Sequence, residues 1–324
     1  MKAILYHNYG SPDVLKFEDV EKPTAGDNEV LIKVRAASVN PYDWHFMRGL
    51  PYVVRIIAGL RKPKVPRLGA DVAGQVEAVG RNVTQFKPGD EVFGSCTGAF
   101  AEYACTSEAK IAIKPAKVTF EQAASVPIAA FTALQALRDK GRIQPGQKVL
   151  INGAAGGVGT FGVQIAKSFG AHVAGVCSTR NLDLVRSIGA DTAIDYTKED
   201  FTRSGQRYDI ILDAVGNHSL AACRRVLNPK GILIMAGGKA GRWMIGALTR
   251  GMRAQVLSWS LSQSFVGILA KSNKEDLTIM GDLIATGRVT PVIDRRYSLS
   301  EVPEAIRYLE EGHARGKVVI AIAT

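Results

Sequence analysis

Short runs of apolar residues, separated by turn-forming clusters, mark the first hundred residues of the chain. Segments 1–7 and 30–39 have the composition of β-strands, and the clusters 10–12 and 25–28 between them are rich in Gly, Pro, Asp and Asn. Three further segments also fit short strands: 72–80, 87–94 and 99–105. Short strands with frequent turns predict a small β-barrel or sandwich.

The pattern becomes helical at Thr119. Thr119 and Gln122 have the spacing of a capping box, which predicts that a helix begins there and continues through residues 121–141. Pro127 lies inside this stretch and is expected to kink or split the helix, because proline has no backbone N–H to donate.

From Lys148 onward, apolar strands alternate with helices. Strands are predicted at 148–152, 172–176, 192–195, 208–213 and 231–237, and helices at 161–170, 183–189, around residue 200 and at 220–227. This alternation predicts a parallel sheet covered on both faces. The tail after residue 272 reads as helix, strand, helix and a final strand at 317–323, and it can add elements to the first domain. We therefore predict an α/β protein with a β-rich domain (1–126 and 272–324) and a doubly wound parallel-sheet domain (127–271).

A glycine-rich segment joins the predicted strand 148–152 to the helix that follows it. Gly153, Gly156 and Gly159 recur at every third residue. Such a strand–turn–helix lets the backbone approach a pyrophosphate, whose charge the helix N-terminus favours. A turn that only packs helix on strand would also use glycines, but the surrounding βαβαβ pattern favours a dinucleotide site.

The end of the second predicted strand bears on which dinucleotide binds. An NAD site places an acid about 20 residues after the glycines, where it accepts from the ribose 2′-hydroxyl. Here the strand runs into Cys177-Ser178-Thr179-Arg180, without a carboxylate. Ser178 and Arg180 can donate to a 2′-phosphate, so we expect NADPH, although Arg180 also suits a solvated helix start. Tyr196 can flank the adenine or serve as a core aromatic.

Composition and charge restrict the classes of protein. The chain has 324 residues, 46% hydrophobic and 22% charged, which excludes extended disorder. Its net charge of +11 favours anionic partners without choosing among phosphates, acidic lipids and nucleic acid. We find no basic–aromatic motif of the RNA-binding kind and expect no nucleic-acid partner.

The four cysteines form no CxxC pair, and the N-terminus lacks the apolar core of a secretory signal. The longest uncharged stretch, 254–270, contains serines and glutamines and is a poor membrane span. We expect a cytoplasmic protein.

Four motifs carry a resemblance to a known family: KPGDEV at 87–92, AAGGVG at 154–159, IDY at 194–196 and GHARGKVV at 312–319. With them the chain resembles the medium-chain dehydrogenase/reductase superfamily, in its zinc-independent quinone oxidoreductase branch. Within it the chain looks most like the group of reticulon-4-interacting protein 1 and the chloroplast-envelope quinone oxidoreductase. The resemblance covers essentially the whole chain. It implies a GroES-like substrate domain completed by C-terminal elements, and a Rossmann domain for the cofactor.

The resemblance also implies which residues contact NADPH. Beside the glycines of the turn, these are Ala155, Gly157, Val158, Ser178, Tyr196, His313, Ala314 and Arg315. By themselves, His313 and Arg315 would read as a polar loop before an edge strand.

The same comparison implies that no metal is bound. Zinc-dependent relatives place Cys where this chain has Asn40, and Gly-His-Glu where it has Gly69-Ala70-Asp71. Two of these three ligand positions cannot supply a good zinc ligand, and the four-cysteine lobe of such relatives is missing.

Three residues are candidates for the catalytic end of the site. Asn40, in a segment resembling the one that lines the nicotinamide, can hydrogen-bond substrate or cap its own backbone. His45 stands where many quinone oxidoreductases have Tyr, and can donate to a carbonyl oxygen or form part of the pocket wall. Thr132 resembles a threonine near the nicotinamide, or is a helix hydroxyl bonded to its own backbone.

Without a zinc ligand set or an evident acid–base pair, we expect hydride transfer from NADPH to a small, hydrophobic, electron-poor acceptor: a quinone, or the activated C=C bond of an enal or enone. An enoyl-thioester reductase and a non-catalytic NADPH-binding scaffold are the alternatives. Two segments, 51–65 and 242–271, are both apolar and basic. They can roof the substrate pocket, pack a homodimer, contact a membrane surface or simply pack in the core.

Overall fold

Two large sheets, built from different parts of the chain, organise the computed structural model, which describes residues 1–238 and 262–322. The chain divides into two compact units. The first combines Met1–Ala129 with Ser272–Gly287 and Pro291–Thr324, and the second combines Ala130–Lys271 with Arg288–Thr290. The α/β fold predicted from the hydrophobic pattern is confirmed.

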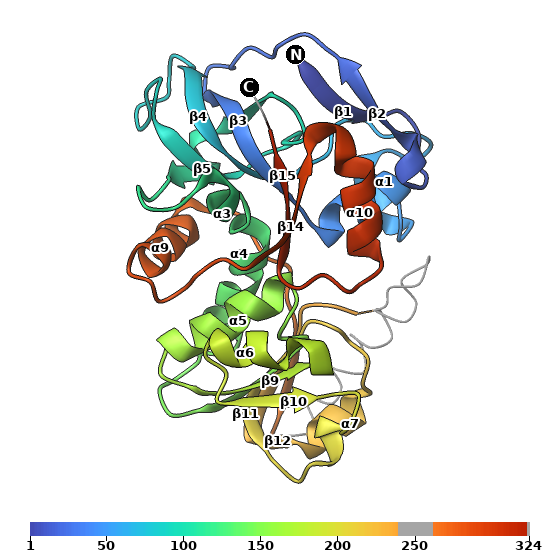
Figure 1. Cartoon of the computed structure of the whole chain (residues 1–324), viewed down its shortest axis with the longest axis vertical. Helices are drawn as coiled ribbons and strands as arrows, with labels where there is room; N and C mark the ends of the chain where they lie inside the picture. The colour runs from blue at the N-terminus through green and yellow to red at the C-terminus, as the bar shows by residue number, and fades with distance from the viewer. Residues whose placement is uncertain (239–261, 323–324) are drawn as a thin grey trace. The chain divides into compact units, whose positions relative to one another are not determined.

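The central strand of the first unit is β3 (Glu29–Val39), most of whose side chains are buried. It pairs antiparallel with β4 (Asp71–Val79), β6 (Tyr103–Ser107) and β15 (Lys317–Ala321). The sheet has the order β14-β15-β3-β4-β5-β7, with β5 at Glu91–Ser95, β7 at Ile111–Ile113 and β14 at Ile293–Ser298. The C-terminal strands therefore complete a sheet begun near the N-terminus (Figure 1).

Short elements surround this sheet. A hairpin pairs β1 (Lys2–Tyr6) with β2 (Leu15–Asp19), and α10 (Val302–Glu310) buries Val302, Ala305 and Ile306 in the core of the unit. The helices α1 (Pro41–Arg48), α2 (Val53–Ala58) and α9 (Lys274–Ala285) complete it. We did not predict α1, because it is too short to show a clear helical period, whereas α2 lies in the segment 51–65, for which packing in the core was one of the alternatives.

The predicted helix after Thr119 is split at Pro127, as expected. Thr119 Oγ1 accepts from Gln122 N at 3.1 Å and Gln122 Oε1 accepts from Thr119 N at 3.0 Å, so the capping box is confirmed. The first piece is α3 (Phe120–Ala124) and the second is α4 (Pro127–Gln135), which ends in a π-helical turn at Ala136–Lys140.

The second unit contains a six-stranded parallel sheet of order β10-β9-β8-β11-β12-β13. Numbered along the unit, this is the 3-2-1-4-5-6 order of a dinucleotide-binding fold. Its strands are β8 (Lys148–Asn152), β9 (His172–Cys177), β10 (Thr192–Asp195), β11 (Tyr208–Asp213), β12 (Leu227–Met235) and β13 (Ser264–Gly267).

Among the described residues of this unit, helices α5 (Gly157–Ser168), α6 (Leu182–Ser187) and α7 (Leu220–Arg225) accompany the sheet, in addition to most of α4. The helix predicted around residue 200 is wrong, since only a 3-10 turn forms at Phe201–Arg203. Asp200 Oδ1 accepts from both the backbone N–H and the hydroxyl of Thr202 and so caps the start of this turn, and Gly205, with a φ of +75°, follows its end. None of the described helices has the length and apolar character needed to cross a bilayer.

Candidate dinucleotide site

The glycine-rich turn connects β8 to α5. Gly153 has a φ of +88°, which favours glycine, and its N–H donates to Val176 O at 3.2 Å. The carbonyl of Gly153 accepts from Gly156 N at 3.0 Å. A Cβ on Gly159 would lie 2.0 Å from Gly153 O, so only glycine lets α5 begin this close to the turn.

The N-terminus of α5 is not capped by a side chain. Gly156 is the N-cap residue and has no side-chain oxygen to accept from the first-turn N–H groups. Gly157, Val158 and Gly159 follow without an acidic residue in that turn, and Ala155 lies buried just before it. Backbone donors and the positive end of the helix dipole are thus available to an anion, as a pyrophosphate requires.

A polar cluster that sequence reasoning missed lies where β8 and β11 end, and its members Asn152 and Asp213 are buried. Asn152 and Asp213 are opposite each other in the sheet, and Asn152 Nδ2 donates to Asp213 Oδ1 and to Asn217 Oδ1, both at 2.9 Å. Asp213 Oδ1 also accepts from Gly216 N at 2.8 Å. This is the point at which the strand order reverses, the usual place for a ligand in such a sheet. The signal in the sequence is a polar residue at the last position of each apolar strand.

The end of β9 carries the hydroxyls predicted for phosphate recognition. Ser178 is half-buried and its Oγ accepts from Asn181 Nδ2 at 3.2 Å, whereas Arg180 is exposed. Tyr196 is 55% exposed, which excludes the core role considered for it and leaves its ring accessible. The backbone N–H groups of Gly153 and Ala154 both donate to Val176 O, so the glycine turn is tied to this strand end.

Asp195 brings to this strand end a carboxylate that the sequence of β9 lacks. It ends β10 directly opposite Cys177, and its Oδ2 accepts from Thr179 Oγ1 at 2.6 Å. Its Oδ1 accepts from the backbone N–H and the hydroxyl of Thr197. The hydrogen bond from Thr179, with those from Thr197 and the charge of Lys198, holds the pKa of Asp195 below its usual value. The Asp195 carboxylate is buried and accepts hydrogen bonds from the two threonines.

Asn40, expected to contact substrate, is instead part of a buried network in the first unit. Its Nδ2 donates to Asp71 Oδ2 at 2.8 Å and to Ser38 O at 3.2 Å, and its Oδ1 accepts from Lys317 Nζ at 2.6 Å. Both amide hydrogens are therefore committed, and the residue is 2% exposed. These contacts correct the predicted role: the Asn40 amide bonds the core rather than a substrate.

Three charged groups are part of this network. Asp43, Asp71 and Lys317 are all buried, and Lys317 Nζ lies 3.4 Å from Asp71 Oδ2. Asp43 accepts from the backbone N–H groups of Asn40 and Gly69. Burial, with the nearby charge of Asp71, raises the pKa of Asp43 to about 7, and burial lowers the pKa of Lys317. Within the described residues, no cluster of three His, Cys, Asp or Glu side chains is arranged to hold a metal.

His45 has a defined tautomer. Its Nδ1 lies 2.7 Å from Leu50 O, which can only accept, so Nδ1 carries the proton of the neutral ring. The other nitrogen, Nε2, is then an acceptor. Burial lowers the pKa of His45, which further disfavours the charged form that could donate through Nε2. The predicted donation to a carbonyl oxygen is therefore disfavoured.

The remaining candidates lie in different units. Thr132 is half-buried on α4 in the second unit, with the glycine turn. His313, Ala314 and Arg315 precede β15 in the first unit, and Arg315 N donates to Asp294 Oδ2 at 2.8 Å. Their contacts with cofactor stay predictions. Trp243, Met244, Met252 and Trp259, candidates for the pocket roof, lie outside the described residues.

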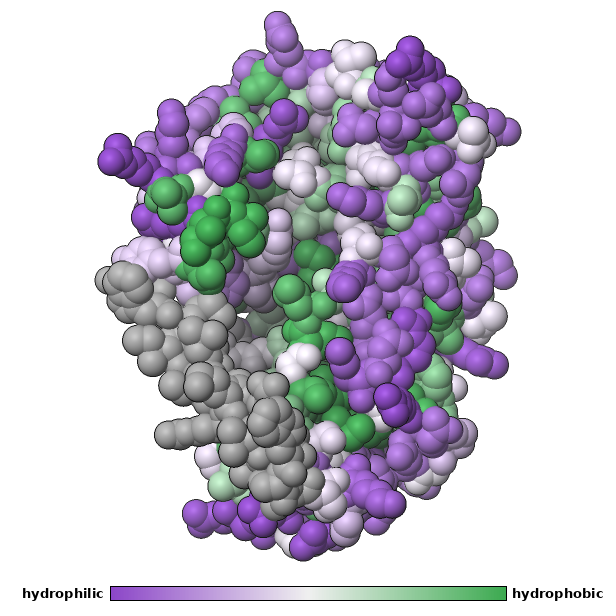
Figure 2. Space-filling model, turned by 180° about the vertical axis from the view of Figure 1, so that it is seen from behind, coloured by the Kyte–Doolittle hydropathy of each residue, from purple (hydrophilic) through white to green (hydrophobic). Residues whose placement is uncertain are grey.

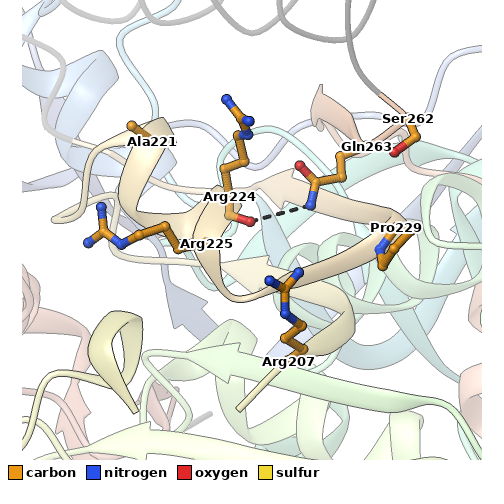
Figure 3. Close-up of a pocket in the computed structure, with 7 residues that line it drawn as sticks. All are labelled: Arg207, Ala221, Arg224, Arg225, Pro229, Ser262 and Gln263. Carbon is orange, nitrogen blue, oxygen red and sulfur yellow. Dashed lines mark hydrogen bonds between the residues drawn. The ribbon is translucent and has the colours of Figure 1, made fainter. Parts of the chain in front are cut away.

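A hollow of about 590 Å³ lies near the amino ends of strands β11, β12 and β13 of the parallel sheet (Figure 3). Arg207, Arg224 and Arg225 line it, together with Gln263, whose Nε2 donates to Arg224 O and Leu227 O. These residues come just before β11, β12 and β13, whereas the glycine turn follows the carboxyl end of β8. The hollow is therefore separate from the candidate dinucleotide site.

Two family models match the chain. Residues 26–116 match the alcohol dehydrogenase GroES-like domain, and residues 188–320 match the zinc-binding dehydrogenase model. The first unit is thus GroES-like and the second is a Rossmann fold, as expected.

Curated relatives and solved structures agree with these matches. The chain is 38% identical to 2-methylene-furan-3-one reductase of Solanum lycopersicum and 37% identical to the chloroplastic NADPH-dependent alkenal/one oxidoreductase of Arabidopsis thaliana, in each case over 99% of this chain and 79% of the relative. The quinone oxidoreductase of Coxiella burnetii has a TM-score of 0.88 at 34% identity, covering 100% of this chain and 99% of that one. The Escherichia coli quinone oxidoreductase complexed with NADPH has a TM-score of 0.85 at 26% identity, covering 99% and 100%.

Proposed function

The chain belongs to the quinone oxidoreductase branch of the medium-chain dehydrogenase/reductase family, and from that premise we propose that it uses NADPH, without zinc, to reduce quinones or the activated C=C bonds of enals and enones. It is an oxidoreductase of a family that uses nicotinamide dinucleotides. Three finer points belong to the proposal: the preference for NADPH, the independence from zinc and the class of acceptor. The homodimer and the cytoplasmic location expected from the sequence stay predictions.

The observation that carries the proposal is the set of donors at the end of β9. Ser178 and Arg180 stand beside a glycine turn whose backbone suits a pyrophosphate. The nearest acid, Asp195, is buried and accepts from Thr179 and Thr197. A hydroxyl and a guanidinium favour a 2′-phosphate, whereas an outward-facing carboxylate would repel it.

The buried network of the first unit supports independence from zinc. Asn40 and Asp71 stand at two of the positions where the family's zinc-dependent members place ligands. Here Asp71 Oδ2 accepts from Ser38 Oγ and Asn40 Nδ2, each at 2.8 Å, and the Lys317 ammonium lies close by. The Lys317 ammonium already occupies this network and would repel a divalent metal ion. The Asn40 amide is a poor zinc ligand, so too few ligands would remain to bind the metal.

The chemistry asked of the protein is then modest. NADPH, when bound, supplies the hydride that reduces the acceptor. A quinone or enone spreads the incoming electron pair over a conjugated system, so the developing oxyanion can be met by a few hydrogen bonds and protonated by water. The chain's own residues bind and orient: the N-terminus of α5 holds the pyrophosphate, and Ser178 and Arg180 hold the 2′-phosphate.

Steady-state kinetics with purified protein test the proposal. Each acceptor class, a small quinone, an enal and an enoyl thioester, is offered with NADPH and with NADH, before and after treatment with a chelator. We expect turnover of quinone or enal with NADPH, little turnover with NADH and no loss after chelation. Turnover of the thioester alone would favour the enoyl-thioester reductase. Equal turnover with NADPH and NADH would contradict the proposal. So would stoichiometric zinc in the purified protein whose removal by the chelator also removes the activity.

A further inference from the structure

The helix α2 directs its apolar stripe towards solvent. Val53, Ile56 and Ile57 have the i, i+3, i+4 spacing of one helix face and are 47%, 67% and 75% exposed, and Leu60, just beyond the C-cap residue Gly59, is 72% exposed. In a water-soluble protein such a stripe normally faces the core. With Val65, which is 50% exposed, these residues are five of the eleven large apolar side chains found exposed in the described chain. We call residues 53–65 the apolar–basic patch. In the space-filling view from behind, a group of apolar side chains (green) lies on the surface with hydrophilic side chains (purple) beside it (Figure 2).

The charges of the apolar–basic patch are all positive. Arg61, Lys62 and Lys64 are exposed, and none of them is ion-paired with a described residue. No Asp or Glu occurs in the sequence between Asp43 and Asp71. The patch is therefore an apolar surface with a cationic rim and no acidic counterpart of its own.

The inner side of the patch is firmly attached to the first unit, so its exposure does not result from a loose end. Tyr9 OH donates to Gly59 O at 2.6 Å, and the Arg55 guanidinium lies 4.5 Å from the centre of the Tyr9 ring. Lys64 N donates to Ala58 O at 2.7 Å, which folds the basic loop back onto the end of α2. A Cβ on Gly59 would lie 2.1 Å from Lys62 O, so this reversal requires glycine.

We propose that the apolar–basic patch docks on an anionic lipid surface. Lipid headgroups supply the negative charge that Arg61, Lys62 and Lys64 lack in the protein, and the acyl boundary accepts Ile56, Ile57 and Leu60. A second copy of the chain fits less well, because a two-fold contact would place the same cations against one another. The patch has only Ile, Leu and Val as exposed apolar anchors, without the outward aromatics that dominate protein interfaces. The helix is short, so insertion is shallow.

Vesicle co-sedimentation of the full chain tests this proposal, independently of the acceptor that the enzyme reduces. Vesicles of phosphatidylcholine alone are compared with vesicles containing one-third phosphatidylglycerol, at low and at high salt. We expect binding to the anionic vesicles to be at least about tenfold stronger, and to weaken at high salt. Ile57→Ser with Leu60→Ser, and separately Arg61→Glu with Lys62→Glu, should each lower binding about tenfold or more. Leu269→Ser, at a residue 92% exposed in the second unit, is the matched control and should bind as the wild type does.

Circular dichroism and NADPH affinity verify that each variant is folded. Failure of the wild type to bind anionic vesicles at low salt would overturn the proposal, as would an equal loss in the Leu269→Ser control. Sedimentation velocity tests the alternative that a second copy of the chain covers the patch. If the wild type is a dimer, the double variant Ile57→Ser with Leu60→Ser is a monomer, and no vesicle binding is seen, the patch is an interface between two copies of the chain.

Discussion

Lys317 Nζ donates to Asn40 Oδ1 at 2.6 Å, across 277 residues of sequence. This hydrogen bond joins β15 to the residue that follows β3, deep in the first unit. The ammonium also lies 3.4 Å from Asp71 Oδ2, so one buried cation serves an amide and a carboxylate. The C-terminal strand thereby neutralises a charge that the N-terminal strands have buried.

Removal of this cation should destabilise the protein strongly. In Lys317→Met the Asp71 carboxylate would remain buried without its ammonium, and breaking such a pair costs about 3–5 kcal/mol. The matched control is Lys167→Met, which breaks a partly exposed pair with Asp191 and should cost less than about 1 kcal/mol. Urea unfolding, followed by circular dichroism, measures both. Similar costs for the two variants would mean that the buried pair contributes no more than a surface pair.

The contribution of Asp43 to stability should fall as the pH rises from about 4 towards 7. Asp43 has a pKa of about 7 in the folded protein, raised by burial, against about 3.9 for an unfolded aspartate. Between these values the folded state binds more protons than the unfolded state, so raising the pH costs stability, by up to about 1.4 kcal/mol per pH unit for one proton. The free energy of unfolding at several pH values, in wild type and Asp43→Asn, measures the slope. The variant should lose that slope, whatever its overall stability, and a slope that persists would assign it to another group.

NADPH binding should depend on Arg180. The loss of a charge-assisted hydrogen bond to phosphate costs about 1.5–3 kcal/mol, so Arg180→Ala should raise the Kd for NADPH about tenfold to a hundredfold. The Kd for NADH should hardly change, because NADH has no 2′-phosphate. Fluorescence titration with both dinucleotides gives these values. Arg186→Ala, an exposed arginine paired with Asp183, is the control and should leave both unchanged. An equal loss for NADPH and NADH would place Arg180 away from the 2′-phosphate.

Two glycines of the turn should respond differently to an added methyl group. Gly159→Ala would place a Cβ 2.0 Å from Gly153 O, so the turn or α5 must shift and both stability and dinucleotide binding should suffer. At Gly156 the nearest atom, again Gly153 O, is 3.5 Å away, so Gly156→Ala should cost no more than about 1 kcal/mol of stability. Thermal unfolding of the two variants compares them. Equal melting temperatures would contradict the close packing of the helix on the turn.

His45 should be neutral at pH 7 and protonated on Nδ1. Its hydrogen bond to Leu50 O determines the tautomer, and burial lowers its pKa below the usual value of about 6.5. Nitrogen NMR of the ring reports both the tautomer and the titration midpoint. In His45→Ala, turnover should fall less than about tenfold if the ring only lines the pocket. A titration midpoint of His45 above pH 7 would support His45 as a proton donor in the reaction. Complete loss of activity in His45→Ala with intact NADPH binding would do the same.

The local features of the chain could be predicted from the sequence, because they depend on neighbouring residues. The capping box of Thr119, the break at Pro127 and the glycine turn after β8 are all determined within a few residues. The alternation of apolar strands and helices also determined the parallel sheet, since each strand had to be buried on both faces. What the pattern could not show was the short α1, or that a 3-10 turn capped by Asp200 would form where a helix was expected.

The tertiary structure alone decided which side chains are already engaged and which remain available. Asn40 looked free to bind a substrate until strand pairing brought Asp71 and Lys317 to its amide. Asp195 reached the end of β9 only through the register of β10, which no local spacing reveals. Val53, Ile56 and Ile57 had the pattern of a core helix but lie in solvent. In each case the cause is the same: burial and hydrogen bonding depend on residues distant in sequence, which meet only once the sheets have formed.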